Sequence, residues 1–178
     1  MVIAEAEEIV EVPSGVTVTV QDGNVKVKGP NGELVRRLAH PLIAVKRDGN
    51  NVVVSADFPR RKTKALVGTF AAHIRNMVAG SQKDFEYKMK VVYAHFPIKV
   101  KVQGDHVFID NFLGEKTPRK ATIRKGVKVK VSAEEVLVTG SDVESVSQTA
   151  ANIEQATAIR GFDLRVFQDG IYITVKGA

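Results

Sequence analysis

The sequence predicts an α+β protein of two tandem homologous domains, each an antiparallel β-sheet packed against one main α-helix. Three observations support this fold class: an internal repeat, short segments in which apolar and polar residues alternate, and one amphipathic helical stripe in each copy. A chain of 178 residues is long enough for two small domains that each bury a modest core.

The internal repeat sets the expected domain boundaries. VTVTVQDGNVKVKGPNGE, residues 16–33, aligns without a gap on IKVKVQGDHVFIDNFLGE, residues 98–115, at an offset of 82. Because such a repeat marks duplicated structural units, we expect an N-terminal domain over residues 1–81 and a C-terminal domain over residues 82–178. Two further pairs of segments resemble each other: VVVSAD (52–57) with VLVTGSD (136–142), and TFAAHIRN (69–76) with QTAANIEQ (148–155).

Alternating apolar and polar residues predict strands joined by tight turns. Valines occupy every second position of residues 16–20 and again of residues 25–27, with turn residues at 21–24 between them. In LIAVKRDGNNVVVSA, residues 42–56, the DGNN string supplies a second hairpin turn. The GPNG string at 29–32 connects two strand-like runs, so a β-turn is expected there.

One amphipathic helix is expected to close each domain. The apolar residues of both helices recur every three or four positions, which places them on one face. In the first copy this stripe follows Asp57 and Pro59 and consists of Val67, Phe70, Ile74 and Met77 or Val78. In the second copy Ser141 and Glu144 predict a capping box, and the stripe consists of Val143, Val146, Ala150, Ile153 and Thr157.

Positive charge is concentrated in one segment of a chain whose net charge is +6. Residues 115–130 carry seven Lys or Arg against one acid, whereas residues 133–158 carry five acids and no Lys or Arg. Because a concentrated field attracts a polyanion, we expect a nucleic-acid partner. A membrane is not expected, because no apolar run approaches about 18 residues and no amphipathic helix with bulky aromatic anchors accompanies the cations.

The N-terminus has the opposite charge. Residues 1–12 hold four glutamates and no Lys or Arg, so we expect an edge strand over Ile9 to Val12 or a contact with protein. The segment lacks the pattern of a secretory signal, and the chain has no Cys. A cytoplasmic location is therefore expected.

No pattern in the sequence predicts catalysis, a metal site or a cofactor. GEKT, residues 114–117, lacks the glycines and the following helix of a phosphate-binding loop. The four His residues have no second ligand at metal spacing. Asp105, Asp110 and Glu115 have no sign of the buried pocket that acid/base catalysis needs. We therefore expect a binding protein, with an enzyme acting on RNA as the competing class.

NFLGEKTPRK, residues 111–120, predicts a loop in two parts. Phe112 and Leu113 are expected to anchor the loop to its domain, while its cations project outward. The expected phosphate contacts are Lys116, Arg119, Lys120, Arg124, Lys125 and Lys128, with Arg160 and Arg165 as secondary candidates. A further contact, with RNA or with protein, is expected at Arg60, Arg61, Lys62 and Lys64. Phe108 and Phe112 are expected in the core, so base stacking is not predicted.

Several motifs, in order along the chain, resemble a known family. They are RNMVAG (75–80), NFLGEK (111–116), SQTAANIEQAT (147–157) and RVFQDGIYI (165–173). With the duplicated domain, they make the whole chain similar to the universal large-subunit ribosomal protein L-six family, and the last motif resembles its archaeal and eukaryotic branch.

The resemblance implies a structural protein of the large ribosomal subunit that binds large-subunit rRNA mainly through its C-terminal domain. It also implies a position near the sarcin-ricin loop, close to the site of the translational GTPases and to neighbouring ribosomal proteins at the stalk base. Three alternatives stay open at this point: an enzyme acting on RNA, an accessory RNA-binding protein outside the ribosome, and a two-domain protein interaction module.

Overall fold

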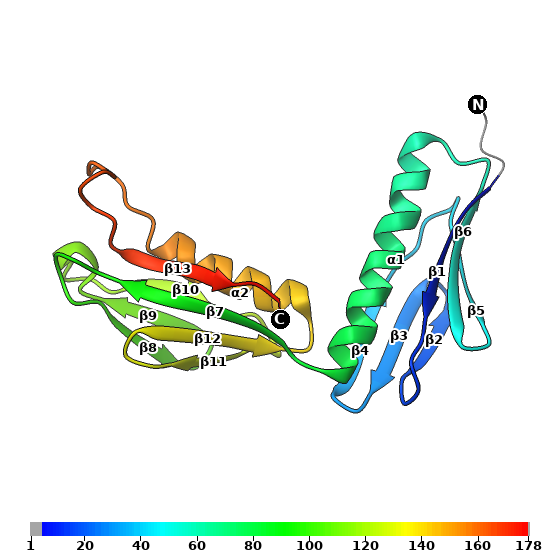
Figure 1. Ribbon diagram of the computed structural model, residues 1–178, viewed down its shortest axis with the longest axis horizontal. Coiled ribbons are helices and arrows are strands. Elements are labelled where there is room, and N and C mark those ends of the chain that lie inside the picture. Colours follow the sequence, from blue (N-terminus) through cyan, green and yellow to red (C-terminus); the bar gives the residue numbers. More distant parts are fainter. Residues whose placement is uncertain (1–4, 178) are drawn as a thin grey trace. The chain divides into compact units, whose positions relative to one another are not determined.

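The computed structural model describes residues 5–177 and divides the chain into two compact units, Met1–Lys83 (unit 1) and Asp84–Ala178 (unit 2) (Figure 1). In the described part of each unit, antiparallel strands pack against one α-helix. The predicted α+β class with two tandem domains is therefore confirmed. The division falls after Lys83 rather than after residue 81, because the helix of unit 1 continues to Gln82.

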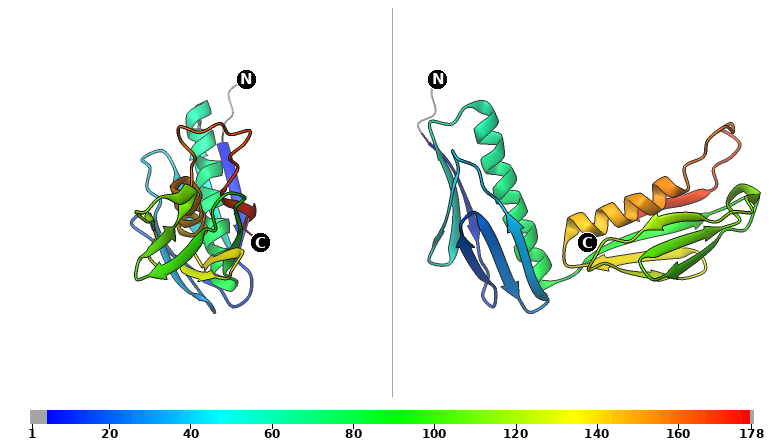
Figure 2. Two further views of the ribbon diagram at one scale, coloured as in Figure 1. Left: turned by 90° about the vertical axis from the view of Figure 1, so that its left-hand side faces the viewer. Right: turned by 180° about the vertical axis from the view of Figure 1, so that it is seen from behind.

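The described residues of unit 1 form two three-stranded antiparallel sheets and one long helix, and the strand orders are β1-β6-β5 and β2-β3-β4. Helix α1 packs against β1, β3 and β6 (Figure 2). The elements are β1 Glu5–Glu11, β2 Thr17–Gln21, β3 Asn24–Gly29, β4 Gly32–Arg37, β5 Ala44–Asp48, β6 Asn51–Asp57 and α1 Arg61–Gln82.

Up to residue 177, unit 2 forms a three-stranded sheet, β10-β9-β8, and a four-stranded sheet, β11-β12-β7-β13. Helix α2 packs along β10 and also against β7, β12 and β13 (Figure 2, right). The elements are β7 Phe85–Val92, β8 Lys99–Gln103, β9 His106–Asp110, the 3-10 turn η1 Phe112–Gly114, β10 Arg119–Thr122, β11 Lys128–Val131, β12 Glu135–Gly140, α2 Val143–Ala156 and β13 Gly170–Val175.

The repeat in the sequence corresponds to a repeat in the structure. The hairpin β2-β3 and the hairpin β8-β9 begin and turn at positions related by the offset of 82. The predicted turn between β2 and β3 is tight, with Asp22 at φ 49° and Gly23 at φ 75°, as two-residue hairpins of matching twist require. The predicted turns at 29–32 and around Gly49 and Asn50 also join paired strands.

Two expectations about the helices are wrong. A helix does close unit 1, but in unit 2 the chain continues after α2 into strand β13, which pairs with β7. The cap of α2 is Asp142 rather than Ser141: its carboxylate accepts hydrogen bonds from the backbone N–H groups of Glu144 and Ser145. An aspartate competes well for this position because its carboxylate also favours the positive end of the helix dipole.

Each unit has its own hydrophobic core. The predicted stripes are buried, except that Phe70 and Val143 are only half-buried and Ala71 lies in the core instead. The fully buried apolar residues of the helices are Val67, Ala71 and Ile74 in unit 1 and Val146, Ala150 and Ile153 in unit 2. Each helix therefore covers apolar residues of the strands of its own unit.

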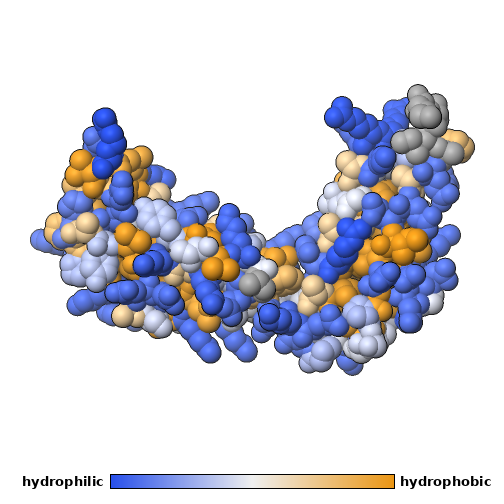
Figure 3. Space-filling model, in the orientation of Figure 1, coloured by the Kyte–Doolittle hydropathy of each residue, from blue (hydrophilic) through white to orange (hydrophobic). Residues whose placement is uncertain are grey.

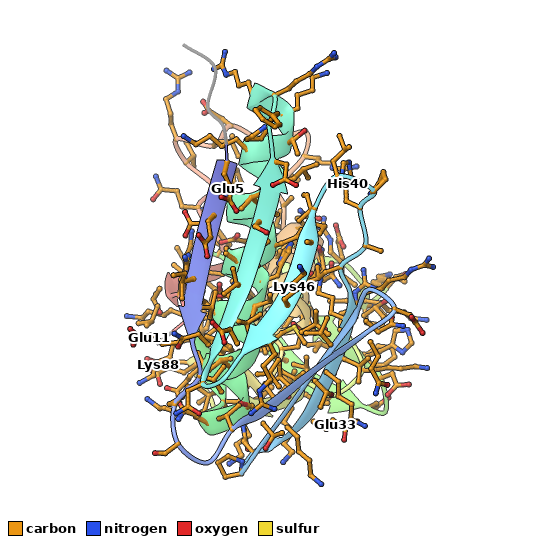
Figure 4. The ribbon with its side chains drawn as sticks, turned by 90° about the vertical axis from the view of Figure 1, so that its right-hand side faces the viewer. Glu5, Glu11, Glu33, His40, Lys46 and Lys88 are labelled. Atoms are coloured by element: carbon orange, nitrogen blue, oxygen red, sulfur yellow. The ribbon has the colours of Figure 1, made fainter. Side chains whose placement is uncertain are left out.

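The acidic N-terminus forms an edge strand, β1, which pairs only with β6 among the described strands. The strand runs over Glu5–Glu11 and is longer than the expected segment, while Val12 follows it with a backbone hydrogen bond to Asn50. Figure 4 shows Glu5 and Glu11 at opposite ends of β1. Residues 1–4 of the acidic segment lie outside the described residues.

Candidate nucleic-acid interface

Strand β10 places neighbouring cations on opposite faces of its sheet. Arg119 pairs with Ile109 of β9, and Lys120 pairs with Phe108. Ala121 and Ile109 are buried on the side that faces α2, so Arg119 lies on that side and Lys120 on the other. The expectation that both cations project outward is therefore wrong, because adjacent residues of a strand cannot share a face.

Arg119 is bound within the protein through its whole guanidinium group. Its Nε and Nη2 donate to the two carboxylate oxygens of Glu115 at 2.9 and 2.7 Å. Its Nη1 donates to the carbonyl oxygens of Ala156 and Ala158, both at 2.9 Å, and the guanidinium lies 4.3 Å from the ring centroid of Phe112. Since the side chain is only 25% exposed, we assign Arg119 to holding the loop rather than to binding phosphate.

Arg119 provides hydrogen-bond donors for carbonyl groups at the C-terminal end of α2. The last carbonyl groups of a helix have no partner inside the helix, and a cationic side chain near them is favourable. Hydrogen bonds from Arg119 and its positive charge hold the pKa of Glu115 below the ordinary value of 4.5, although burial acts in the opposite direction. Glu115 therefore stays ionised and keeps Arg119 oriented.

The apolar half of the loop lies against the core. Phe112 is 0% exposed, and Leu113 packs against the same cluster. Asn111 and Leu113 both adopt the left-handed backbone conformation, which is costly for leucine outside a fixed environment. The Asn111 side-chain amide donates to the carbonyl oxygen of Pro97 at 3.1 Å. The turn η1 is thus held in one conformation before any partner binds.

Five of the predicted cations are exposed and point away from the core. Within residues 5–177 none of these five side chains takes part in an ion pair. They are Lys116, Lys120, Arg124, Lys125 and Lys128. They occupy the segment from η1 through β10 to the start of β11, and we refer to them as the free cation set.

The connection between β10 and β11 is fixed to α2. The backbone N–H of Arg124 donates to the hydroxyl of Thr149 at 3.1 Å, and the Asn152 amide donates to the carbonyl oxygen of Thr122 at 2.9 Å. The N–H of Ile123 also bonds to the carbonyl oxygen of Asp105. The exposed side chains of Arg124 and Lys125 therefore extend from an ordered backbone, which lowers the entropy lost on binding.

The secondary candidates lie elsewhere. Arg160 and Arg165 are exposed in the loop between α2 and β13, and Arg165 makes a 3.2 Å ion pair with Asp163. The four cations of the RRKTK segment surround the start of α1, where no side chain caps the helix and no acid occupies the first turn. These are Arg60, Arg61, Lys62 and Lys64.

The base of the loop between α2 and β13 is fixed by Asp169, whose side chain is 1% exposed. Its carboxylate accepts hydrogen bonds from the backbone N–H groups of Ala94 and His95 and lies 3.1 Å from the His95 Nδ1. The His95 ring stacks on Phe167, with centroids 4.4 Å apart. Burial tends to raise the pKa of Asp169, but these hydrogen bonds outweigh it and bring the pKa below its ordinary 3.8.

The stability of unit 2 should therefore depend on Asp169 in acid. The pKa of Asp169 is lower in the folded protein than its ordinary value of 3.8. The stabilisation from the ionised carboxylate is therefore complete above pH 3.8, and it is lost as the pH falls through the pKa of the folded state. Thermal unfolding followed by the fluorescence of the chain's three tyrosines, Tyr87, Tyr93 and Tyr172, reports on unit 2 alone. Asp169→Asn should lower the Tm at neutral pH and flatten its decline below pH 4; a parallel decline in both proteins would contradict this role.

The position of Phe108 differs from the one predicted from the sequence. Phe108 was expected in the core with Phe112, but it is half-buried and lies on the opposite face of β9 from Val107 and Ile109. All three residues are apolar, so the alternation that identifies a strand face is hidden. The sequence also did not predict the partners of two lysines on this face: Lys101 makes an ion pair with Asp110 at 3.0 Å, whereas Lys120 lies over the Phe108 ring.

Among residues 5–177, no group of three His, Cys, Asp or Glu is placed to hold a metal ion. Neither helix has the length and apolar character that a membrane crossing requires. The loop between α2 and β13 exposes Phe162, Leu164 and Val166, which form apolar surface at the upper left of Figure 3.

The comparisons with known proteins match this architecture. The family model described as Ribosomal protein L6 matches residues 12–84 and 96–170, one match in each unit. The large ribosomal subunit protein uL6 of Methanobrevibacter smithii is 52% identical over 177 residues, which cover 99% of each chain. The protein of the same name from Ignicoccus hospitalis is 54% identical over 173 residues, covering 94% of this chain and 93% of the relative. The chain therefore belongs to the ribosomal protein L6 family.

Proposed function

We propose that this protein binds large-subunit rRNA, mainly through unit 2, as a structural constituent of the large ribosomal subunit. The observation that supports this most directly is the free cation set, whose five side chains are exposed and have no ion-pair partner among the described residues. Such a concentration of like charge is unfavourable in an isolated protein and favourable against a polyanion.

Binding would combine charge with shape. Phosphates of a folded RNA replace the counterions near the free cation set, which releases those ions into solution. The ordered backbone of η1 and of the β10–β11 connection presents a fixed contour to the irregular surface of the RNA. Arg119 and Glu115 support this contour, because their ion pair and the Arg119 hydrogen bonds join the loop to the end of α2.

The family resemblance also supports a specific position on the large ribosomal subunit. NFLGEK and its neighbouring motifs favour a position near the sarcin-ricin loop, beside the site of the translational GTPases, with the protein bound to cytoplasmic ribosomes. Neighbouring ribosomal proteins at the stalk base are the proposed protein partners. The exposed apolar residues Phe162, Leu164 and Val166 are suited to such a protein contact, because an apolar patch next to arginines favours a partner surface over open water.

The salt dependence of binding tests the electrostatic proposal. Five neutralised phosphates should give a slope of about −3.5 to −4.5 for log affinity against log salt. We would measure it with the full chain and a transcript of the large-subunit rRNA. A slope near zero would exclude the proposed mechanism. Sedimentation of the protein away from ribosomes in a cell extract would instead indicate an accessory role outside the ribosome.

A further inference from the structure

The outer face of the β10-β9-β8 sheet carries an aromatic ring between two cations. The strand register places Lys120 opposite Phe108 on one side and Lys101 opposite Phe108 on the other. The three residues therefore form one row across the sheet, on the face that points away from the core. Figure 1 labels β8, β9 and β10, the three strands of this sheet.

The ring of Phe108 is not part of the hydrophobic core. Its neighbours Val107 and Ile109 are both 0% exposed on the opposite face, while Phe108 is half-buried. The Nζ of Lys120 lies 5.5 Å from the centroid of the ring, and the Lys120 side chain is exposed. This face of the ring is therefore covered by the exposed Lys120 side chain rather than by the core.

The charge around the ring is predominantly positive. Lys99 is exposed one row further along β8. Strand β11 contacts β8 and exposes Lys128 and Lys130, while Val129 between them packs toward the core. The acid of this face at Asp110 is already paired with Lys101 at 3.0 Å. Cations thus surround the Phe108 ring on the outer surface of the sheet.

A second ring extends the aromatic surface. His106 is exposed on the same face of β9, two residues before Phe108, and the two ring centroids are 6.3 Å apart with a tilt of 47° between the planes. Aromatic side chains on a strand with nearby cations are the arrangement by which proteins hold unpaired nucleotides, because every base has a π-face and every linkage has a charge.

We propose that this face binds an unpaired nucleotide of RNA, whose base stacks on Phe108 while Lys120 and Lys101 contact the flanking phosphates. The inference rests on the proposed rRNA binding and deepens it, because it adds recognition of a base to contacts with the backbone. When RNA binds, the Lys120 ammonium group moves from the Phe108 ring to a phosphate. It therefore has a favourable electrostatic contact in both the free and the bound protein. An acidic protein segment would be attracted by the same cations but has no need for the exposed ring.

The absence of tryptophan from this chain gives a direct probe of stacking. Phe108→Trp places the only indole of the full-length protein on the face in question, and Phe162→Trp in the exposed loop of the same unit is the control. The probe is an oligouridylate of about 12 nucleotides, within the usual site size for a single strand. We expect its addition to quench the emission of Phe108→Trp and to leave that of Phe162→Trp unchanged.

Affinities separate the base from the backbone. A strand of the same length without bases should bind the wild type about tenfold more weakly than the oligouridylate. Phe108→Leu, which keeps an apolar side chain, should lose the same factor for the oligouridylate, lose nothing for the abasic strand, and keep the salt slope of the wild type. The Tm of each variant, followed by tyrosine fluorescence, confirms that it is folded.

Each outcome decides between the two proposals. Stacking on Phe108 would be overturned if the wild type bound the oligouridylate and the abasic strand equally, or if the oligouridylate did not change the emission of Phe108→Trp. In either case a steep salt slope would leave the rRNA proposal intact. Loss of the salt slope as well would overturn both. Quenching by polyglutamate instead of by the oligouridylate would also overturn the inference and identify the face as a site for acidic protein.

Discussion

Replacing Phe112 with alanine is expected to lower the free energy of unfolding of unit 2 by about 3–5 kcal/mol. The side chain is fully buried in the core of that unit, and its ring also lies against the Arg119 guanidinium. The truncation therefore creates a cavity and removes the packing that keeps η1 in its left-handed conformations. Chemical denaturation followed by tyrosine fluorescence measures the change, because all three tyrosines lie in unit 2.

Phe162→Ala is the matched control, because Phe162 belongs to the same unit but is 50% exposed. Its ring contacts Phe167 with centroids 4.8 Å apart, so the loss should stay within about 1.5 kcal/mol. Binding to RNA is better tested with Phe112→Leu, which retains most of the buried apolar volume. We expect this variant to bind RNA more weakly with an unchanged salt slope, since it loosens the loop and removes no charge. Similar stabilities for Phe112→Ala and the control would show that the loop does not depend on its anchor.

Neutralising the free cation set is expected to have the largest effect on RNA binding. Substituting glutamine for all five cations should reduce affinity for the rRNA about 10³- to 10⁴-fold at about 0.1 M salt and bring the slope close to zero. The five side chains are exposed and carry no structural hydrogen bonds among the described residues, so the variant should fold normally. Filter binding at several salt concentrations gives both affinity and slope.

The cluster at the start of α1 provides the comparison. Glutamine at Arg60, Arg61, Lys62 and Lys64 removes a similar amount of charge from unit 1. If unit 2 makes most of the contacts with RNA, the fold-loss in affinity of this variant should be less than about a tenth of the fold-loss caused by neutralising the free cation set. Equal losses would mean that both units hold the RNA, and would contradict the proposed division of labour.

The fold was predictable because its signals are local. Alternating valines define β2 and β3 within a dozen residues, Asp-Gly and Gly-Asn pairs mark two of the turns, and the repeat extends the same assignment to unit 2. Strand β10 was missed because its four residues, RKAT, are too short and too polar for a clear alternation. Strand β13 was missed as a closing element because the first copy has no equivalent that the repeat would predict.

The candidate site was predictable only in part. Local charge density identified the free cation set, but the role of Arg119 depends on the carbonyl groups of Ala156 and Ala158, which lie 37 and 39 residues away in the sequence. Only the folded chain brings them together. The position of Phe108 likewise depends on the strand face, which three consecutive apolar residues conceal.

The edges of β1 and β7 differ in how readily they could pair with a strand of another molecule. In unit 2 the outer edge of β7 is covered by β13, whereas β1, its counterpart in unit 1, has no strand on that side among the described residues. An uncovered strand edge is a template for pairing with another molecule. Glu5, Glu7 and Glu11 are exposed along β1, so two copies that approach edge to edge repel each other. The acidic strand thus disfavours aggregation of the isolated chain.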